Sequence, residues 1–411
     1  MHMILATMGT DGDVFPYLGL GAVLRGRGHR VTLAAPETYR EQAQALRLEF
    51  CAIVTTAETT RMLADPDLWH PFRSGLMMAR WGGPMIPRHY DAIVNLISSE
   101  SDTVVVANPG VLAARLVQEK LAVPMATLLL QPGLIPSNIA PPEMPGGATL
   151  PRWLPHALRP LYWLAVDGAG YAIVAPHLNP FRKRLGLPPV RRIFRWWLSP
   201  QRVIGLFPSW YAAPQRDWPP QSRLAGFADF DGTEQSLSAE LKAFCDEGPP
   251  PVAFTLGTGM SHAGEFFRTA VAVCEALGVR GLLLTKFPQA LPGHLPQDVR
   301  HSTFAPFRQL LPRCAAVVHH GGIGTTTAAL QSGCPQVVLP LAWDQPDNAA
   351  RVVRLGVGAS LALGRRGREH VASALATVTT PDVRNRCRFI AQSAVPADGF
   401  ANAAQWIETL C

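Results

Sequence analysis

Short apolar runs alternate with helix-forming segments in two parts of this chain, and this alternation limits the fold more than any other feature. Near the start, an apolar run at Met3–Met8 precedes a Gly/Asp-rich turn, a segment with helical apolar spacing that ends at Gly28, and the run "RVTLAAP". Apolar runs joined by a helix predict parallel strands that are buried on both faces. The pattern returns after Pro249–Pro251 in "VAFTLG", "EFFRTAVAVCEALG" and "GLLLTK". We therefore predict an α/β protein with two doubly wound domains.

The length of 411 residues also favours two domains, because one hydrophobic core seldom serves so long a chain. Hydrophobic residues make up 48% and charged residues 16%, which argues against disorder. The predicted parts are an N-terminal domain at 1–220, an interdomain linker at 221–250, a C-terminal domain at 251–383, and a C-terminal helix at 384–411 that crosses back to the N-terminal domain. The prolines and aromatic residues between Pro141 and Pro220 indicate an insertion in the first domain.

The composition limits the kinds of partner and cofactor that the protein is expected to bind. The net charge of +7 favours an anionic partner, but the arginines are dispersed and no nucleic-acid-reading motif occurs, so nucleic-acid binding is not predicted. The seven cysteines contain no CxxC pair and no carboxylate cluster suggests Mg²⁺, so neither a metal nor a cofactor is predicted. No signal-peptide pattern precedes the first strand, and no apolar run reaches about 18 residues. We expect a cytoplasmic protein, a monomer or weak dimer.

A glycine-rich turn marks the most informative stretch, "AAVVHHGGIGTTTAALQSGCPQVVLPLAWDQPDN". It follows a predicted strand and begins a predicted helix, the edge at which open α/β sheets bind ligands. Gly321, Gly322 and Gly324 allow the backbone to approach a ligand, and the free N–H groups around Thr325 favour an anion. The spacing matches neither a P-loop nor GxGxxG. The alternative interpretation is a structural turn with capping threonines.

Polar residues on either side of that turn favour a binding site. A histidine, His319 or His320, precedes the glycines and can donate a hydrogen bond to a phosphate oxygen. Asp344 and Gln345 follow the next predicted strand at the same sheet edge, where a carboxylate and an amide can hold sugar hydroxyls.

These motifs resemble a known family. The stretch "HHGGIGTTTAALQSGCPQVVLPLAWDQPDNA" is similar to the donor-binding signature of family 1 nucleotide-sugar glycosyltransferases, which have the two-domain GT-B fold. The start, "ATMGTDGDVFPYLGLG", resembles the acceptor-side loop of bacterial sterol, antibiotic and lipid glycosyltransferases. The segments "DPDLWHP", "RRIFRWWLSPQRVIGLFPSWYAAPQRDWP" and "AGFADFDG" are similar to the rhamnosyltransferase chain that makes rhamnolipids. The resemblance implies two Rossmann-like domains that face a cleft.

The resemblance also implies roles on the donor side. The donor-binding residues that it implies are Thr258 at the β-phosphate, Phe304 beside the base, His320 with Gly322, Gly324 and Thr325 at the diphosphate, and Asp344 and Gln345 at the sugar hydroxyls. The rhamnolipid-type sequence keeps the earlier histidine, so His319 remains an alternative to His320. Plant members have a glutamate for the ribose hydroxyls where this chain has Ala328, so UDP and a thymidine diphosphate both stay open.

The resemblance of the first loop implies which residue is the catalytic base. Plant members have a histidine where this chain has Asp13, in "GTDGDVFP", and several bacterial members have aspartate there. Such a base must be partly desolvated so that its pKa rises. A helix-capping role before Pro16 is the structural alternative, and Asp11 is a competing base. The resemblance implies inversion at the sugar, with His320, Thr325 and the helix N-terminus stabilising the leaving diphosphate without a metal.

The acceptor is expected to be small and hydrophobic. A hydroxy-fatty-acid lipid and a flavonoid-like phenolic both fit the aromatic middle region. Candidate lining residues are Trp69, Met77, Met78, Trp81 and Trp163. Arg182, Lys183, Arg184, Arg191, Arg192 and Arg195 lie near tryptophans, which also suggests a peripheral contact with the inner face of the membrane; the alternative is that these aromatics only pack on the first domain. Two other functions remain open: a nucleotide-sugar epimerase, and a non-catalytic sugar-nucleotide or lipid-binding protein.

Overall fold

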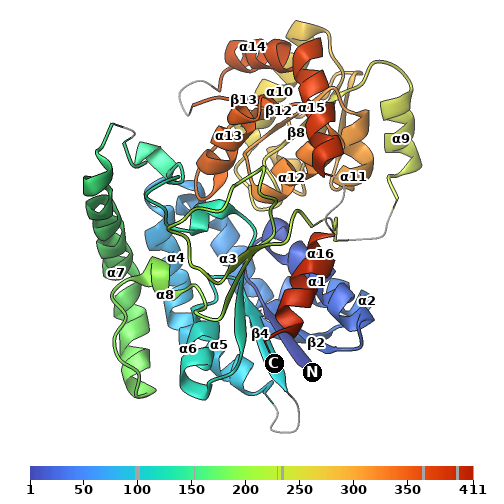
Figure 1. Ribbon diagram of the computed structural model, residues 1–411. Coiled ribbons are helices and arrows are strands. Elements are labelled where there is room, and N and C mark those ends of the chain that lie inside the picture. Colours follow the sequence, from blue (N-terminus) through green and yellow to red (C-terminus); the bar gives the residue numbers. More distant parts are fainter. Residues whose placement is uncertain are drawn as a thin grey trace. The chain divides into compact units, whose positions relative to one another are not determined.

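Two compact units make up the chain, Met1–Gly232 with Ala397–Cys411, and Thr233–Pro396. The computed structural model describes residues 1–97, 102–151, 153–228, 230–232, 236–362, 366–394 and 398–410. Each unit is built on a sheet of parallel strands with helices packed around it (Figure 1). The predicted α/β class with two Rossmann-like domains is therefore confirmed.

The sheet of the first unit has seven strands in the order β3-β2-β1-β4-β5-β6-β7. The strands are β1 (His2–Ala6), β2 (Arg30–Pro36), β3 (Glu49–Val54), β4 (Thr103–Ala107), β5 (Met125–Leu129), β6 (Arg202–Gly205) and β7 (Ser222–Leu224). The helices are α1 (Asp11–Gly26), α2 (Arg40–Ala45), α3 (Thr56–Ala64), α4 (Ser74–Gly82), α5 (Ile86–Val94), α6 (Leu112–Leu121), α7 (Arg159–Arg184), α8 (Ile193–Trp196) and α16 (Gly399–Glu408). Strand order reverses between β1 and β4, so the carboxyl end of β1 lies at a topological switch point, where such sheets bind ligands.

The sheet of the second unit has six strands in the order β10-β9-β8-β11-β12-β13. The strands are β8 (Val252–Thr255), β9 (Gly281–Leu284), β10 (Val299–Ser302), β11 (Ala316–His319), β12 (Gln336–Val338) and β13 (Gly358–Ser360). The helices are α9 (Ala239–Asp246), α10 (Gly264–Leu277), α11 (Phe307–Leu310), α12 (Ile323–Ser332), α13 (Gln345–Arg354), α14 (Arg368–Val378) and α15 (Pro381–Ala394). His319 is in register with Thr255, so the loops after β8 and β11 leave the sheet side by side at its switch point.

The predicted linker at 221–250 contains more structure than expected. Its first part forms β7, which pairs with β6 in the first sheet. Its second part forms α9, whose Leu241 and Cys245 are buried in a hydrophobic cluster of the second unit. The division between the units falls at Gly232, inside the predicted segment. Short elements of three to eight residues have too little periodicity to stand out from a linker in sequence.

The predicted C-terminal helix at 384–411 is two helices. The first, α15, packs on α12 of the second unit, whereas α16 packs on α1 of the first unit. A new helix begins because the carboxylate of Asp398 caps it, accepting a hydrogen bond from the N–H of Ala401 at 3.1 Å. Residues 395–397 and 411 of this prediction lie outside the described residues.

Helix α16 is fixed to the first unit by packing and by ion pairs. The ring of Phe400 lies against Gly19 of α1, where a Cβ atom would come within 2.5 Å of it. Glu408 accepts hydrogen bonds from Arg27 at 2.9 Å and from His29 at 2.8 Å. Asn402 donates to the carbonyl of Ala225 at 2.9 Å. The first unit therefore includes a helix that follows the second unit in the sequence.

Several aromatic residues of the insertion pack inside the first unit. Trp163 is 6% exposed and its Nε1 donates to the carbonyl of Ser137 at 3.1 Å. The guanidinium of Arg182 lies 5.2 Å from the ring of Trp196 and pairs with Glu119 at 2.6 Å. These residues therefore hold the insertion to the sheet. Across the part of the chain that the structure describes, no helix is both long and apolar enough to cross a membrane.

Candidate active site

The loop between β1 and α1 positions Asp13. Thr10 is the N-cap of α1, and its backbone N–H donates to Oδ2 of Asp13 at 2.9 Å, with the Thr10 hydroxyl 3.5 Å from the same oxygen. Asp13 is thus the third residue of the helix and the reciprocal partner of a capping box. Both bonds end on Oδ2, and within the described ranges no hydrogen bond to Oδ1 is found. The carboxylate can cap the helix through one oxygen and accept a proton at the other.

Electrostatics distinguish Asp13 from Asp11. Residue 13 is partly exposed, yet its carboxyl group is shielded, and this burial raises its pKa to about 6. Hydrogen bonds from Thr10 lower this pKa, and the charge of Asp11 raises it further. Asp11 instead accepts a hydrogen bond from the hydroxyl of Tyr39 at 2.8 Å. Asp13 therefore has the pKa that a general base needs near neutral pH.

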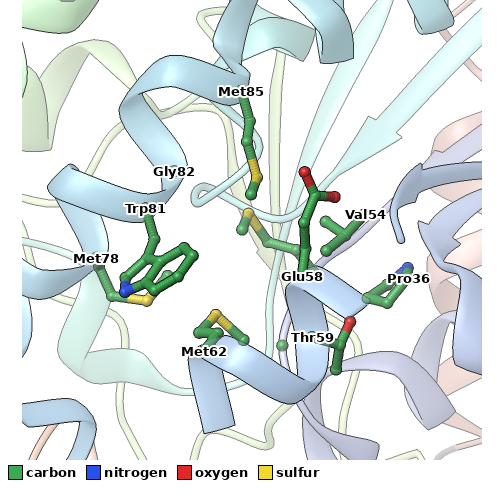
Figure 2. A pocket seen from close by; sticks show the side chains of 11 residues that line it. Pro36, Val54, Glu58, Thr59, Met62, Met78, Trp81, Gly82 and Met85 are labelled. Atoms are coloured by element: carbon green, nitrogen blue, oxygen red, sulfur yellow. The ribbon is translucent and has the colours of Figure 1, made fainter. Parts of the chain in front are cut away.

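An apolar pocket lies next to Asp13, and Figure 2 shows the side chains that line it. It encloses about 370 Å³, including the part that is open to solvent. The lining residues are Met8, Gly9, Pro36, Val54, Glu58, Thr59, Met62, Met78, Trp81, Gly82 and Met85. Gly9 joins the pocket to the carboxylate, because a Cβ atom at this position would lie 2.2 Å from Oδ2 of Asp13. Gly9 therefore lines the pocket and lies next to this carboxylate.

Only some of the predicted acceptor residues line this pocket. Trp81 and Met78 of α4 do, and Nε1 of Trp81 donates to Asp65 at 3.1 Å. Met77, on the same helix, is 1% exposed and packs inward. Trp69, Trp163 and Asp11 are not among the lining residues.

Sequence reasoning missed three of the four methionines in the lining. Met8 follows β1, Met62 lies in the last turn of α3 and Met85 ends the short helix η3 (Gly83–Met85), so no spacing in the sequence connects them. Flexible thioether side chains adapt to ligands of different shape.

Substitution of Gly9 by alanine is expected to displace the Asp13 carboxylate. Gly9 has a φ of +130°, which L side chains rarely adopt, and the added methyl group would overlap the carboxylate. We expect kcat to fall by about 100-fold, because misplacement by about 1 Å costs this much. Steady-state kinetics will measure it, with Gly12→Ala as the control, since no atom lies within 4 Å of a Cβ there. Equal rates for both variants would contradict the proposed contact.

On the donor side, His319 supports the turn from inside. It is 0% exposed, its Nδ1 accepts a hydrogen bond from the N–H of Gly321 at 3.1 Å, and its Nε2 donates to the side-chain oxygen of Gln336 at 3.0 Å. Burial, and then the charge of His320, lower its pKa to about 3, so the ring is neutral. Both ring nitrogens are used within the protein, which makes His319 a structural residue.

His320 lies instead between two glycines at the sheet edge. A Cβ atom would lie 2.7 Å from its ring at Gly257 and 2.6 Å from it at Gly322. Burial lowers the pKa of His320 to about 4, so its imidazole is neutral and can donate one N–H. Gly322 is the N-cap of α12 and Thr325 is buried in the first turn of that helix. The imidazole and the N-terminus of a ten-residue helix are therefore adjacent, as an anion site requires.

Three other predicted donor residues belong to the second unit, two in loops after its strands and one in α12. Thr258 follows Gly257 after β8 and is partly exposed, and Gly324 is exposed in the first turn of α12. Phe304 follows β10 and is 37% exposed, so its ring is accessible to a planar group.

Asp344 and Gln345 differ in their surroundings. The side-chain oxygen of Gln345 accepts hydrogen bonds from the N–H groups of Leu341 and Ala342 at 2.7 and 3.1 Å, and the residue is 1% exposed. Asp344 is partly exposed, and Asn348 donates to it at 2.6 Å and to the carbonyl of Gly321 at 2.9 Å. Gln345 therefore shapes its own loop, whereas Asp344 presents a carboxylate at the sheet edge. The bonds of Gln345 use only its side-chain oxygen, so the assignment of both residues to the sugar hydroxyls stays a prediction.

Comparison with known proteins gives the class. Residues 3–133 match the glycosyltransferase family 28 N-terminal domain, and residues 284–397 match the erythromycin biosynthesis protein CIII-like C-terminal domain. A crystal structure of the glycotransferase of kitacinnamycin superposes with a TM-score of 0.75 at 21% identity, covering 100% of this chain and 98% of that one. The two Rossmann-like units and these matches define a sugar transferase of the GT-B fold.

Two relatives establish the family. The O-mycaminosyltylonolide 6-deoxyallosyltransferase of Streptomyces fradiae is 32% identical, covering 100% of this chain and 98% of the relative. The vancomycin aglycone glucosyltransferase of Amycolatopsis orientalis is 30% identical, covering 98% and 96%. The chain belongs to the bacterial family 1 glycosyltransferases.

Proposed function

We propose that the protein transfers a hexose from a UDP- or dTDP-sugar to a hydroxyl group of a neutral, largely apolar natural product. The observation that carries this proposal is the apolar pocket whose Gly9 wall borders the Asp13 carboxylate. The carboxylate in the lining of this pocket, Glu58, is paired with Arg88 at 2.8 Å, so it offers no free charge to an acceptor. Ring-shaped aglycones, phenolics and hydroxy-acyl lipids all match this lining, and the names of the two relatives favour an aglycone.

The loops after β8, β10, β11 and β12 supply the proposed donor site. We assign the donor diphosphate to the N-terminus of α12 with His320, Thr325 and Thr258. The sugar hydroxyls are assigned to Asp344 and Gln345, and the nucleobase of the donor is assigned to Phe304. A neutral imidazole donates a hydrogen bond without the cost of burying a second charge. Plant members bind the ribose hydroxyls with a glutamate, and this chain has Ala328 at that position. Both a UDP-sugar and a dTDP-sugar are therefore proposed as donors.

The proposed reaction is a single displacement. The acceptor oxygen forms a bond to C1 of the sugar as its proton passes to Asp13, and the bond from C1 to the diphosphate oxygen breaks on the opposite face. The electron pair of that bond leaves with the nucleoside diphosphate. His320 and the α12 N–H groups stabilise the growing negative charge. The product is a glycoside of inverted anomeric configuration.

A substrate panel tests the proposal. UDP-glucose, dTDP-rhamnose and UDP-GlcNAc are each incubated with a macrolide aglycone, a flavonol and a hydroxy-fatty-acid lipid, and the products are identified by mass and anomeric configuration. A β-glycoside from an α-linked donor supports inverting transfer. An isomerised sugar nucleotide without acceptor would identify an epimerase, and donor binding without turnover would identify a binding protein.

The pH dependence of kcat/KM should show the ionisation of Asp13. The base must be deprotonated, and its pKa is raised to about 6, so kcat/KM should fall tenfold per pH unit below about 6 and level off above it. Asp11→Asn removes the charge that raises this pKa and keeps an acceptor for Tyr39, so the acid limb should move to lower pH. An acid limb centred near 4 in the wild type would contradict the assignment.

A further inference from the structure

The outer face of α7 is uncharged along most of its length. Its exposed positions from 160 to 180 are Pro160, Leu161, Leu164, Ala165, Gly168, Ala169, Tyr171, Ala172, Pro176 and Pro180. The opposite side of the helix is buried against the unit and includes Trp163, Leu178 and Phe181. A surface helix normally has a polar outer face, and a helix that is apolar on all sides is normally covered on all sides. Something outside the described unit should therefore cover this face.

Neighbouring elements extend the apolar surface. Trp153 is 81% exposed, and Leu158, in the turn before α7, is 45% exposed. Helix α4 packs against α7; Phe72, just before α4, is 66% exposed, and Leu76, in its first turn, is 50% exposed. Leu161 and Leu164 of α7 are 61% and 58% exposed. We name the seven residues Phe72, Leu76, Trp153, Leu158, Leu161, Leu164 and Tyr171 the apolar face. Large exposed apolar patches mark interaction sites.

The exposed charges of α7 and of the segment that follows it are positive. The exposed charged residues between 159 and 195 are Lys183, Arg184, Arg191, Arg192 and Arg195. The one acidic residue in that range, Asp167, is 6% exposed and thus turned inward. At 100° per residue, Lys183 falls roughly 40° from Leu161 around the helix, so the two lie on the same side. One of the six basic residues predicted near the membrane, Arg182, is buried and paired with Glu119, so its expected role is corrected.

We propose that the apolar face, with Lys183 and Arg184, binds the surface of an anionic lipid bilayer. Helix α7 would lie along the surface, with Leu161, Leu164 and Trp153 among the acyl chains and the basic end on anionic headgroups. A helix of 26 residues is about 39 Å long at 1.5 Å per residue, which provides an extended contact. A protein partner of ordinary polarity would match the rim of this surface with acidic groups, whereas a bilayer matches both the apolar area and the positive end.

The position of α4 gives this contact a use, which rests on the proposed function. The same helix presents Leu76 on the apolar face and lines the acceptor pocket with Met78 and Trp81. An apolar acceptor dissolved in the bilayer would therefore need to travel only along α4 to reach the pocket. Transfer to a water-soluble acceptor would not depend on the bilayer.

Vesicle co-sedimentation of the full chain tests the contact. Vesicles of phosphatidylcholine with 30% phosphatidylglycerol are compared with pure phosphatidylcholine vesicles. We expect the wild type to bind the anionic vesicles and Leu161→Ser/Leu164→Ser to reduce the partition coefficient at least about tenfold. Lys183→Glu/Arg184→Glu should reduce binding to anionic vesicles and remove its salt dependence. The matched control is Leu121→Ser/Leu277→Ser, because these leucines are 42% and 40% exposed on other helices.

The outcomes that would contradict the bilayer proposal can be told apart from one another. Absence of wild-type binding to anionic vesicles overturns the proposal, and so does binding that survives the Leu161/Leu164 variant. If light scattering shows concentration-dependent dimers that this variant abolishes, the face is a contact between two copies instead. Turnover of a water-soluble acceptor, measured without vesicles, should be equal in wild type and variant. Its loss in both proteins would count against the proposed function and leave the vesicle result to stand alone.

Discussion

Asp13→Asn is expected to lower kcat about 1000-fold while the protein stays folded. General-base catalysis contributes about 10²- to 10⁴-fold, and asparagine cannot accept the acceptor's proton. In the wild type, the N–H of Thr10 donates to Oδ2 of Asp13 at 2.9 Å. The side-chain oxygen of asparagine can accept the same hydrogen bond, so the capping box survives. Steady-state kinetics at saturating donor and acceptor, at pH 8, will measure this loss.

Stability measurements separate the catalytic role of Asp13 from its capping role. Its pKa is raised from 3.8 to about 6, so the folded state favours the neutral carboxyl and loses stability as the pH rises through 6. Asp13→Asn should therefore leave the free energy of unfolding at pH 8 unchanged or slightly higher. Asp13→Ala should lose both activity and about 1 kcal/mol of the cap. A rate for Asn within tenfold of wild type would show that Asp13 is only a cap.

The adjacent histidines should respond in opposite ways to alanine. His320→Ala is expected to lower kcat about 100-fold, because one hydrogen-bond donor to a developing anion is worth about 10²- to 10³-fold. His319→Ala is expected to lower the free energy of unfolding by about 3 kcal/mol, because it leaves a cavity and removes the partners of Gly321 and Gln336.

Urea denaturation and kinetics per folded molecule will distinguish the two. The expected pattern is a stable, slow His320 variant and an unstable His319 variant whose folded fraction turns over normally. The reverse pattern would place His319 on the diphosphate. Thr377→Ala, on α14, is a control that should change neither quantity, because its side chain is exposed and its hydroxyl donates to the carbonyl of Ser373 in the same helix at 3.0 Å.

The sheets and their loops could be predicted because buried parallel strands leave a direct signal. Strands such as β1 and β11 are buried along their whole length, so they appear as apolar runs with polar residues at the carboxyl end. The turn with His320 was identified for that reason, whereas the role of Asp13 came from the resemblance of its loop to that of the family. The same logic placed Gln345 at the sheet edge, but could not show that its side-chain oxygen is bound by its own loop.

The acceptor side could not be predicted to the same depth. Met8, Met62 and Met85 come together from three segments, and methionine in a helix usually signals core packing rather than a ligand. The aromatic residues of the insertion gave a wrong expectation for a similar reason. Trp163, a predicted acceptor-site residue, is buried, whereas Trp153 is exposed. Exposure depends on which side of a helix faces the sheet, and α7, with apolar residues all round, gives no sequence signal for that choice.

The attachment of α16 to α1 has a consequence for synthesis on the ribosome. The surface of α1 around Gly19 receives Phe400, which the ribosome adds 381 positions later, after every residue of the second unit. Until then, the nascent first unit must carry an uncovered apolar surface on α1, while the second unit has all its elements in one continuous stretch. The second unit can therefore complete its fold before the first, the opposite of the order of translation, and nascent chains stalled before residue 399 would be the ones to recruit chaperones.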